Sequence, residues 1–310
     1  MLAEVTITPW HWAGFVVCIL IFLALDLGVF HRSAHVVKFR EALAWTALWF
    51  AVAMCFAWAL GGWKGREASE MFITGYLLEL SLSMDNVFVI ALIFSYFRVP
   101  SEHQHRVLFW GIIGALVMRG AMIGVGAALV ARFHWVLYIF GAFLLFTGVK
   151  MCFAGEGGVE PDKNFVVRLA RKFFPVTHQF EGQKFFTLVN GRRALTPLAL
   201  VLLMVETTDL IFALDSIPAI FGVTRDPFIV FTSNVFAILG LRSLYFVLAN
   251  AIDYFRFLKY GLSLVLVFIG AKMLGEHWIN IPTRVSLGIV VGIILLSVLL
   301  SVLVTARKKE

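Results

Sequence analysis

Acidic side chains stand inside long apolar stretches of this sequence, where water cannot solvate them freely. Six carboxylates lie within such runs: Asp26, Glu79, Asp85, Glu206, Asp209 and Asp215. A charged side chain at the centre of a membrane helix costs about 2.5–3.5 kcal/mol on insertion scales. Six unpaired acids would therefore cost on the order of 15–20 kcal/mol, which is comparable to the stability of a whole fold. These acids must be paired with bases, hydrated or bound to a cation.

Four of these acids belong to two motifs with the same spacing. Each motif has an acid, five intervening residues, a second acid and a small polar neighbour: Glu79, Asp85 and Asn86 in the first, and Asp209, Asp215 and Ser216 in the second. Positions seven apart on a helix lie about 20° apart around its axis, whereas positions six apart lie about 120° apart. The first acid and the polar residue therefore share a stripe, and the second acid points to a flank unless the helix is locally unwound. Pro218, which has no backbone N–H, could also free a carbonyl beside the second motif.

We predict that the two stripes face each other and form an oxygen-rich cation site. Its predicted ligands are Glu79, Asp85, Asn86, Glu206, Asp209, Asp215 and Ser216, with Ser83 and Thr208 beside them. Oxygen ligands suit hard cations such as Mn²⁺, Mg²⁺ and Ca²⁺ rather than Zn²⁺ or Cu⁺. The same carboxylates could carry protons in an antiport cycle. Internal ion pairing is the structural alternative, and its bases would be Arg119, Lys150, Arg242 and Lys272.

Long apolar runs must position these acids. The chain has 310 residues, of which 61% are hydrophobic and 15% charged, whereas soluble domains carry about 25% charged residues. A membrane span needs about 20 mostly apolar residues. This rule predicts a single all-α transmembrane domain over 1–310, a polytopic membrane protein. Its nine predicted spans are 10–30, 42–60, 71–96, 107–130, 134–153, 196–220, 228–250, 257–275 and 282–304.

Two segments of the chain, 71–153 and 196–275, form an internal repeat of three spans each. The landmarks that match in order are the acid motifs, Arg119 with Arg242, Tyr138 with Tyr260, and Lys150 with Lys272. Because each repeat has an odd number of spans, the second is predicted to be inverted relative to the first. Inverted repeats with a site near the bilayer midplane are a common architecture of secondary transporters.

Lys and Arg residues are divided unequally between the loops. Alternate loops on one side contain 17 of them, and those on the other side contain 5. Because basic loops stay in the cytoplasm, we expect the N-terminus outside and the C-terminus in the cytoplasm of a bacterial inner membrane. This placement explains the net charge of +7 without nucleic acid as a partner. The loop 154–195 is then cytoplasmic, with a predicted amphipathic helix at 165–174 and a β-hairpin that turns at Asn190-Gly191.

The cysteines do not indicate redox chemistry. Cys18, Cys55 and Cys152 are isolated in apolar sequence and form no CxxC motif. We interpret them as structural thiols. No catalytic residues and no organic cofactor are expected, so we do not predict an enzyme.

Four long motifs resemble the TerC family of integral membrane proteins, and within it the alkali-induced, Alx-type members. They are Glu79–Val89, Tyr138–Met151, Ala213–Phe221 and Asp226–Arg242. The resemblance runs over nearly the whole chain. The family takes its name from tellurium resistance, its members are often labelled membrane-bound redox modulators, and Alx-like members are associated with manganese export. The resemblance therefore implies Mn²⁺ as the cation and carries the two acid motifs over as site residues.

Three functions remain open from the sequence. The leading hypothesis is a divalent-cation exporter, with Mn²⁺ first, coupled to protons or to the membrane potential. The second is a membrane-bound redox or assembly factor that acts through the loop 154–195 without transport. The third is an exporter of a small organic solute such as a basic amino acid, for which Phe88, Phe212 and Phe221 would supply apolar contacts. The expected partners are the cation, protons and the lipid bilayer, and the oligomeric state is left open.

Overall fold

The structure of the chain is a computed structural model. It describes residues 8–25, 39–153, 164–177, 179–189, 191–248, 258–278 and 281–307. Asp26, one of the six predicted membrane acids, and Asn190, in the predicted hairpin turn, lie outside the described residues.

Helices make up most of the described chain, and a helix occupies each of the nine predicted apolar runs. They are α1 (Pro9–Leu25), α2 (Phe39–Lys64), α3 (Arg66–Tyr96), α4 (Ser101–Arg132), α5 (Val136–Phe153), α7 (Pro197–Phe221), α8 (Pro227–Leu248), α9 (Leu258–Leu274) and α10 (Thr283–Arg307). Within the described ranges, all but α1 and α9 of these helices are long and apolar enough to cross a membrane. Those two are shorter, with 17 residues each. The chain is an all-α polytopic membrane protein, and the count of nine spans stays a prediction.

Residues between the helices stop one helix and start the next. Gly65 is the single residue between α2 and α3, and it has a φ of 96°. Glycine accepts this left-handed backbone without strain, so the chain can end one helix and begin the next within one residue. Pro197 opens α7 directly after Thr196, whose side chain accepts a hydrogen bond from the backbone N–H of Ala199. Asp226 caps α8 in a similar way by accepting a hydrogen bond from the backbone N–H two residues on, at 2.9 Å. Local capping therefore fixes where the second acid-bearing helix and its successor begin.

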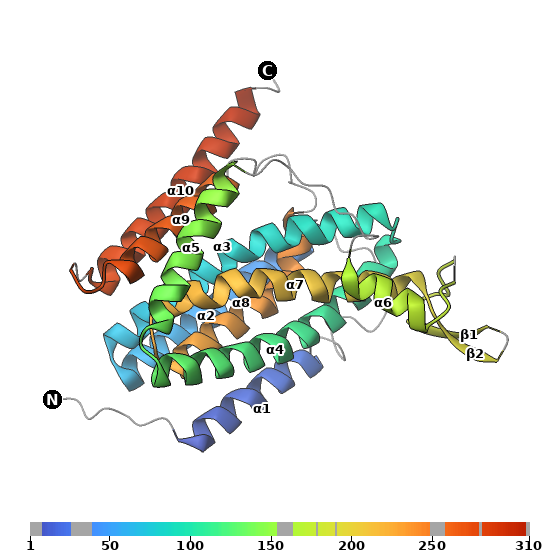
Figure 1. Cartoon of the computed structure of the whole chain (residues 1–310), viewed down its shortest axis with the longest axis horizontal. Helices are drawn as coiled ribbons and strands as arrows, with labels where there is room; N and C mark the ends of the chain where they lie inside the picture. The colour runs from blue at the N-terminus through green and yellow to red at the C-terminus, as the bar shows by residue number, and fades with distance from the viewer. Residues whose placement is uncertain are drawn as a thin grey trace.

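Two groups of helices differ in direction. In Figure 1, α3, α4, α7 and α8 run side by side along the long axis, whereas α5, α9 and α10 cross them steeply. The main packing pairs are α3 with α8, α4 with α7, and α5 with α9, and α3 also packs on α7. The two acid-bearing helices, α3 and α7, thus lie together in the middle of the bundle, and α5 packs across α7.

Small residues allow α5 and α9 to cross in close contact. A Cβ added to Gly270 would lie 2.7 Å from the carbonyl oxygen of Gly141, and one added to Gly148 would lie 2.9 Å from the carbonyl oxygen of Ser263. The Ser263 hydroxyl also donates a hydrogen bond to the Gly148 carbonyl. Real Cβ atoms do not come this close to backbone, so only glycine fits at these contacts.

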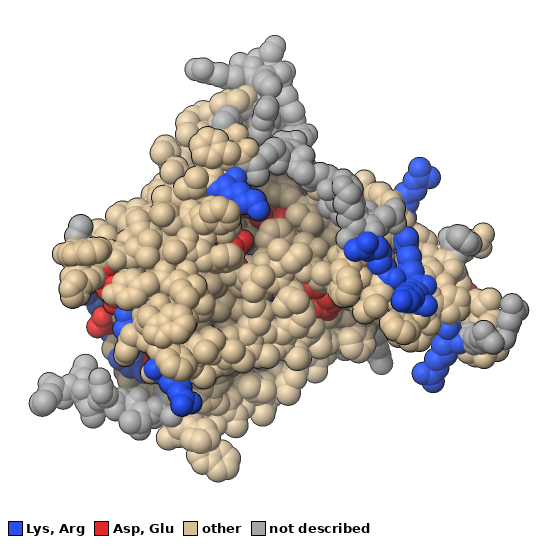
Figure 2. All heavy atoms as spheres, in the orientation of Figure 1, with Lys and Arg blue, Asp and Glu red and all other residues tan. Residues whose placement is uncertain are grey.

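The segment between α5 and α7 lies at one end of the bundle (Figure 1). It contains the short helix α6 (Phe165–Phe173) and an antiparallel hairpin of β1 (Phe186–Val189) and β2 (Arg192–Leu195). Gly191 in the hairpin turn has a φ of 74°. Basic side chains gather at this end, whereas the opposite end mixes acidic and basic side chains (Figure 2).

Candidate functional site

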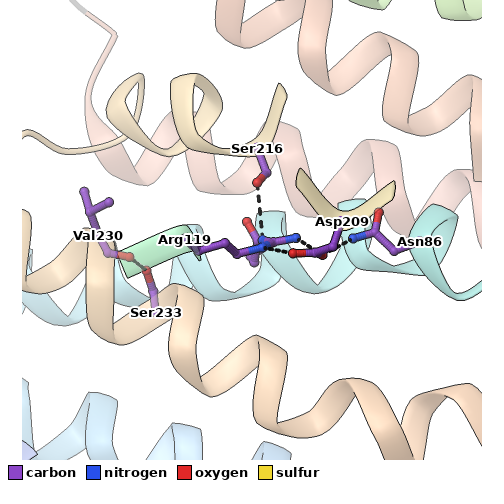
Figure 3. A network of polar contacts seen from close by, with 7 residues as sticks. Asn86, Arg119, Asp209, Ser216, Val230 and Ser233 are labelled. Atoms are coloured by element: carbon purple, nitrogen blue, oxygen red, sulfur yellow. Dashed lines mark hydrogen bonds and ion pairs between the residues drawn. The ribbon is translucent and has the colours of Figure 1, made fainter. Parts of the chain in front are cut away.

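A buried arginine joins the two acid motifs. Arg119 of α4 is only 2% exposed and reaches between α3 and α7. Its guanidinium forms an ion pair with Glu79 of α3 through Nη1. It also binds both carboxylate oxygens of Asp209 of α7, from Nε to Oδ2 at 3.1 Å and from Nη2 to Oδ1 at 2.8 Å. The first acid of each motif is therefore held by one shared base, and Figure 3 shows its contact with Asp209.

The polar residues of the two stripes complete this cluster. The Asn86 amide donates to Asp209 Oδ1 at 3.2 Å, and Arg119 Nη1 donates to the Ser216 hydroxyl at 3.4 Å. We call Glu79, Asn86, Arg119, Asp209 and Ser216 the Arg119 network (Figure 3). The predicted convergence of the two stripes is therefore observed for these residues, with an arginine at the centre.

Some buried oxygens of this region have no hydrogen-bond partner among the described residues. They are Glu79 Oε2, Asn86 Oδ1 and the Ser83 hydroxyl. Buried polar atoms are nearly always satisfied, and an exception indicates an absent water or ion or a functional role. These atoms are therefore available to accept a hydrogen bond from water or to coordinate a cation.

A cavity of about 280 Å³ lies beside the Arg119 network. The polar side chains that line it are Glu79, Asp85, Asn86, Arg119, Thr147, Lys150, Asp215 and Ser216. Apolar wall residues include Leu82, Met151, Phe212 and Leu266. We call it the acid cavity. Since one water occupies about 30 Å³ of liquid volume, the acid cavity has room for a hydrated ion.

The second acid of each motif faces the acid cavity. Thr147 of α5 donates a hydrogen bond to Asp215, and Lys150 of α5 attracts the same carboxylate electrostatically. Lys259 of α9 attracts Asp85. The α5 helix therefore contributes to the site. Lys150 was expected from the sequence only as a possible pairing base, and Thr147 was not predicted.

No helix break is needed to bring the second acids to the site. Both α3 and α7 continue unbroken through the motifs, and α7 contains Pro218 within its helical range. Asp85 and Asp215 point to a flank, as the helical geometry predicts, and α5 forms the far wall of the cavity on that flank. Local unwinding, which the sequence left open as an alternative, does not occur at either motif.

Glu206 lies elsewhere. It does not line the acid cavity, and its carboxylate fits against Gly114 of α4, where a side chain would collide with it. Its Oε2 atom is buried and has no hydrogen-bond partner in the part of the chain that the structure describes. The Thr208 hydroxyl bonds within its own helix, to the Met204 carbonyl at 2.7 Å. Glu206 is therefore a neighbour of Asp209 on α7, but it belongs neither to the Arg119 network nor to the wall of the acid cavity.

The predicted ligands form no single closed shell. Over the described ranges, no three His, Cys, Asp or Glu side chains stand close enough together to hold a metal ion. Four predicted ligands belong to the Arg119 network, and the remaining three are the cavity acids Asp85 and Asp215 and the separate Glu206. Internal pairing therefore accounts for Glu79 and Asp209, and it leaves the cavity acids with a different environment.

Sequence comparison identifies the relatives of this chain. The family described as "Integral membrane protein TerC family" matches residues 64–309. An "Uncharacterized membrane protein STKORF319" of Myxococcus xanthus is 55% identical over 91% of this chain and 89% of its own. A "Putative membrane-bound redox modulator Alx" of Escherichia coli K12 is 49% identical over 91% of each chain. An "Uncharacterized membrane protein" of Rickettsia bellii is 40% identical over 90% of this chain and 93% of its own.

No solved structure matches this chain. The resemblance seen in the four sequence motifs is confirmed by the family match and by these relatives. The chain belongs to the TerC family of integral membrane proteins.

Proposed function

We propose that this protein exports a divalent cation, with Mn²⁺ as the first candidate, across a bacterial inner membrane. The observation that carries the proposal is the acid cavity, in which Asp85 and Asp215 from the two repeats line one space. Their carboxylates lie outside the Arg119 network. They are therefore free of the strongest internal base and can bind a cation.

The donor atoms around the acid cavity suit a hard cation. Asp85 and Asp215 supply carboxylate oxygens, and Glu79 Oε2 and Asn86 Oδ1 supply further oxygens without partners among the described residues. Oxygen sets of this kind favour Mn²⁺, Mg²⁺ or Ca²⁺. The cation is the cargo, so the site must bind it without holding it tightly. Lys150 at the wall limits the net negative charge and supports such moderate affinity.

Coupling to protons follows from the same acids. When the cation leaves, two carboxylates facing a cavity inside the membrane would be left with unfavourable charge. Proton binding to Asp85 or Asp215 would remove that charge. We therefore propose that protons return through these acids, with the membrane potential as the alternative driving force.

The helix packing supports the proposed inverted repeat. If α3, α4 and α5 correspond to α7, α8 and α9, a two-fold axis exchanges the contact of α3 with α8 and the contact of α7 with α4. Both contacts are present. At the α5–α9 crossing the same exchange turns the Gly141–Gly270 contact into the Gly148–Ser263 contact, and both of these occur. We propose that the cargo site lies at the interface of these two repeats.

The charge distribution supports the proposed orientation. Basic side chains dominate the end that contains α6 and the hairpin (Figure 2). At the opposite end the bases are matched by acids, as in the pairs Lys64–Asp226 and Arg225–Glu276. Since unpaired positive charge favours the cytoplasmic side, we propose that the α6 end is cytoplasmic and the N-terminus is outside.

Transport in everted membrane vesicles tests the proposal. Vesicles that contain the protein should accumulate Mn²⁺, and Asp85→Asn and Asp215→Asn should each abolish this uptake. Glu102→Gln, which changes an exposed acid outside the acid cavity, is the matched control and should keep it. Full Mn²⁺ uptake by the double variant Asp85→Asn/Asp215→Asn would refute the proposed site. Uptake of labelled lysine or arginine in place of Mn²⁺ would favour an organic solute, for which Phe212 already lines the cavity.

A second candidate, a redox modulator, is favoured by the printed name of the Alx relatives. The three cysteines Cys18, Cys55 and Cys152 are free and lie on different helices. Replacing all three by alanine separates the two functions. The exporter proposal predicts unchanged Mn²⁺ transport, whereas a thiol-based modulator would lose its effect.

A further inference from the structure

A second cavity shares four helices, α3, α5, α7 and α9, with the acid cavity. It has a volume of about 320 Å³, and its wall includes Met71 of α3, Leu137 of α5, Phe221 of α7 and both Lys272 and Met273 of α9. We call it the Lys272 cavity. The acid cavity also takes wall residues from α3, α5, α7 and α9. Two cavities that share their helices are parts of one possible path through the bundle.

Only a thin partition separates the two cavities. On α7, Ser216 lines the acid cavity and Phe221 lines the Lys272 cavity, a separation of about 7.5 Å along the helix at 1.5 Å per residue. On α9, Leu266 lines the acid cavity and Lys272 lines the Lys272 cavity, and the two residues are about 9 Å apart along the helix. Along these two helices the partition is therefore about one and a half helical turns thick.

The partition consists of packed apolar side chains. Ile217, Ile220 and Ile269 are each at most 3% exposed and belong to one hydrophobic cluster, which also contains Phe221 and Met273. An ion in the acid cavity would therefore meet a dry apolar layer, and beyond it the Lys272 cavity.

The repeat relates the walls of the two cavities. Lys150 and Met151 of α5 line the acid cavity, and the matching Lys272 and Met273 of α9 line the Lys272 cavity. The crossing contacts Gly141–Gly270 and Gly148–Ser263 show that α5 and α9 run antiparallel. The two Lys-Met pairs consequently stand at opposite ends of the crossing, as the two mouths of an inverted-repeat path would.

We propose that the Lys272 cavity is the release site for the exported cation, on the side of the membrane opposite to the mouth of the acid cavity. The proposal rests on the proposed export function. In the wall of the Lys272 cavity, Glu276 is paired with Arg225, whose Nη2 lies 2.6 and 2.7 Å from the two carboxylate oxygens. Because Arg225 and Glu276 neutralise each other, Lys272 gives the described wall a net positive charge. A divalent cation is attracted to the acid cavity and repelled by the Lys272 cavity, so it dissociates there instead of binding again.

Thiol labelling from each side of the membrane tests this proposal. All variants carry alanine in place of the three native cysteines, so that one new cysteine reacts at a time. Thr283→Cys places a thiol in the wall of the Lys272 cavity, and Met151→Cys places one in the acid cavity. A membrane-impermeant maleimide should label Thr283→Cys in intact cells, and it should label Met151→Cys only in everted vesicles.

The functional readout is Mn²⁺ efflux from loaded cells before and after labelling. Labelling of Thr283→Cys should cause loss of efflux by blocking release. His277→Cys, an exposed neighbour that does not line the cavity, is the matched control and should be labelled without loss of efflux. Labelling of Thr283→Cys and Met151→Cys from the same side would overturn the proposal, as would continued efflux after complete labelling of Thr283→Cys.

The two proposals can fail separately. In one outcome the unlabelled cysteine-free protein does not export Mn²⁺, while Thr283→Cys and Met151→Cys still react from opposite sides. The export function is then wrong, and so is the release role of the Lys272 cavity. If that protein exports Mn²⁺ but labelled Thr283→Cys still transports, the release site alone is wrong.

Discussion

Glu79 and Asp85 lie six residues apart on one helix, yet they have different surroundings. Both line the acid cavity, but Glu79 is fully buried and held by Arg119, whereas Asp85 lies outside the Arg119 network. Asp209 and Asp215 repeat this contrast on α7. The first acids face α4, which supplies the Arg119 guanidinium, whereas Asp215 faces Thr147 and Lys150 of α5 and Asp85 is attracted by Lys259 of α9. The comparison teaches that the neighbouring helix decides the role of each acid: the first pair joins α3 to α7, and the second pair is available to a ligand.

Removing the shared base Arg119 should disrupt the contact through which the first acids, Glu79 and Asp209, join α3 to α7. We expect Arg119→Met to destabilise the protein by about 3–5 kcal/mol, because it leaves two buried carboxylates without their partner. Thermal unfolding of the purified protein in lipid nanodiscs measures the effect. The control Arg225→Gln removes an exposed ion pair and should change stability by only about 0–1 kcal/mol. Equal loss in the two variants would contradict a structural role for the Arg119 network.

Neutralising one acid of each kind sharpens the contrast within a single helix. Glu79→Gln should lower stability by about 1.5–3 kcal/mol, because a charge-assisted hydrogen bond to a buried arginine is weakened. Asp85→Asn should leave unfolding nearly unchanged while it abolishes Mn²⁺ transport. Both variants are measured by thermal unfolding and by vesicle uptake. A larger loss of stability in Asp85→Asn than in Glu79→Gln would reverse the assignment of the two acids.

Displacing α5 should affect the acid cavity, where Asp85 and Asp215 lie, and leave the Arg119 network in place. Gly270→Ala places a methyl group against the backbone of α5, and such overpacking costs about 1–3 kcal/mol. The expected result is reduced stability together with reduced transport, since α5 carries the far wall of the acid cavity. Gly292→Ala on α10 meets no atom within 4 Å and serves as the control. It should be neutral or slightly stabilising, because alanine favours a helix over glycine.

The smallest effect is expected where Glu206 meets α4. Gly114→Ala should change stability by less than about 1 kcal/mol, since a carboxylate at the end of a flexible side chain can move to another rotamer. Transport should also persist if Glu206 lies outside the path. Mn²⁺ uptake is measured for Gly114→Ala and for Glu206→Gln. A strong loss of uptake in both variants would support Glu206 as a cation ligand, as predicted from the sequence.

Much of the site follows from spacing along single helices. Residues seven apart lie on one stripe, and this geometry predicted that Glu79 and Asn86 would meet Asp209 and Ser216. The sequence names Lys150 as a possible pairing base, but it does not indicate which acid Lys150 faces or that Thr147 lies beside it. Thr147 and Lys150 reach the cavity because α5 packs across the bundle, and the direction of a crossing depends on side-chain packing between helices rather than on local pattern. The distance of three residues between Glu206 and Asp209 predicts that they are neighbours on α7, but it does not predict that Glu206 fits against Gly114 on another helix.

The pairing of Arg119 has a consequence for the assembly of the bundle in the membrane. Its guanidinium is neutralised by the carboxylates of Glu79 on α3 and Asp209 on α7. An unpaired charge at the centre of a membrane helix costs about 2.5–3.5 kcal/mol. The three charges are therefore stable in the bilayer only after α3, α4 and α7 have packed together, so the first repeat should not reach its final arrangement before α7 has entered the membrane.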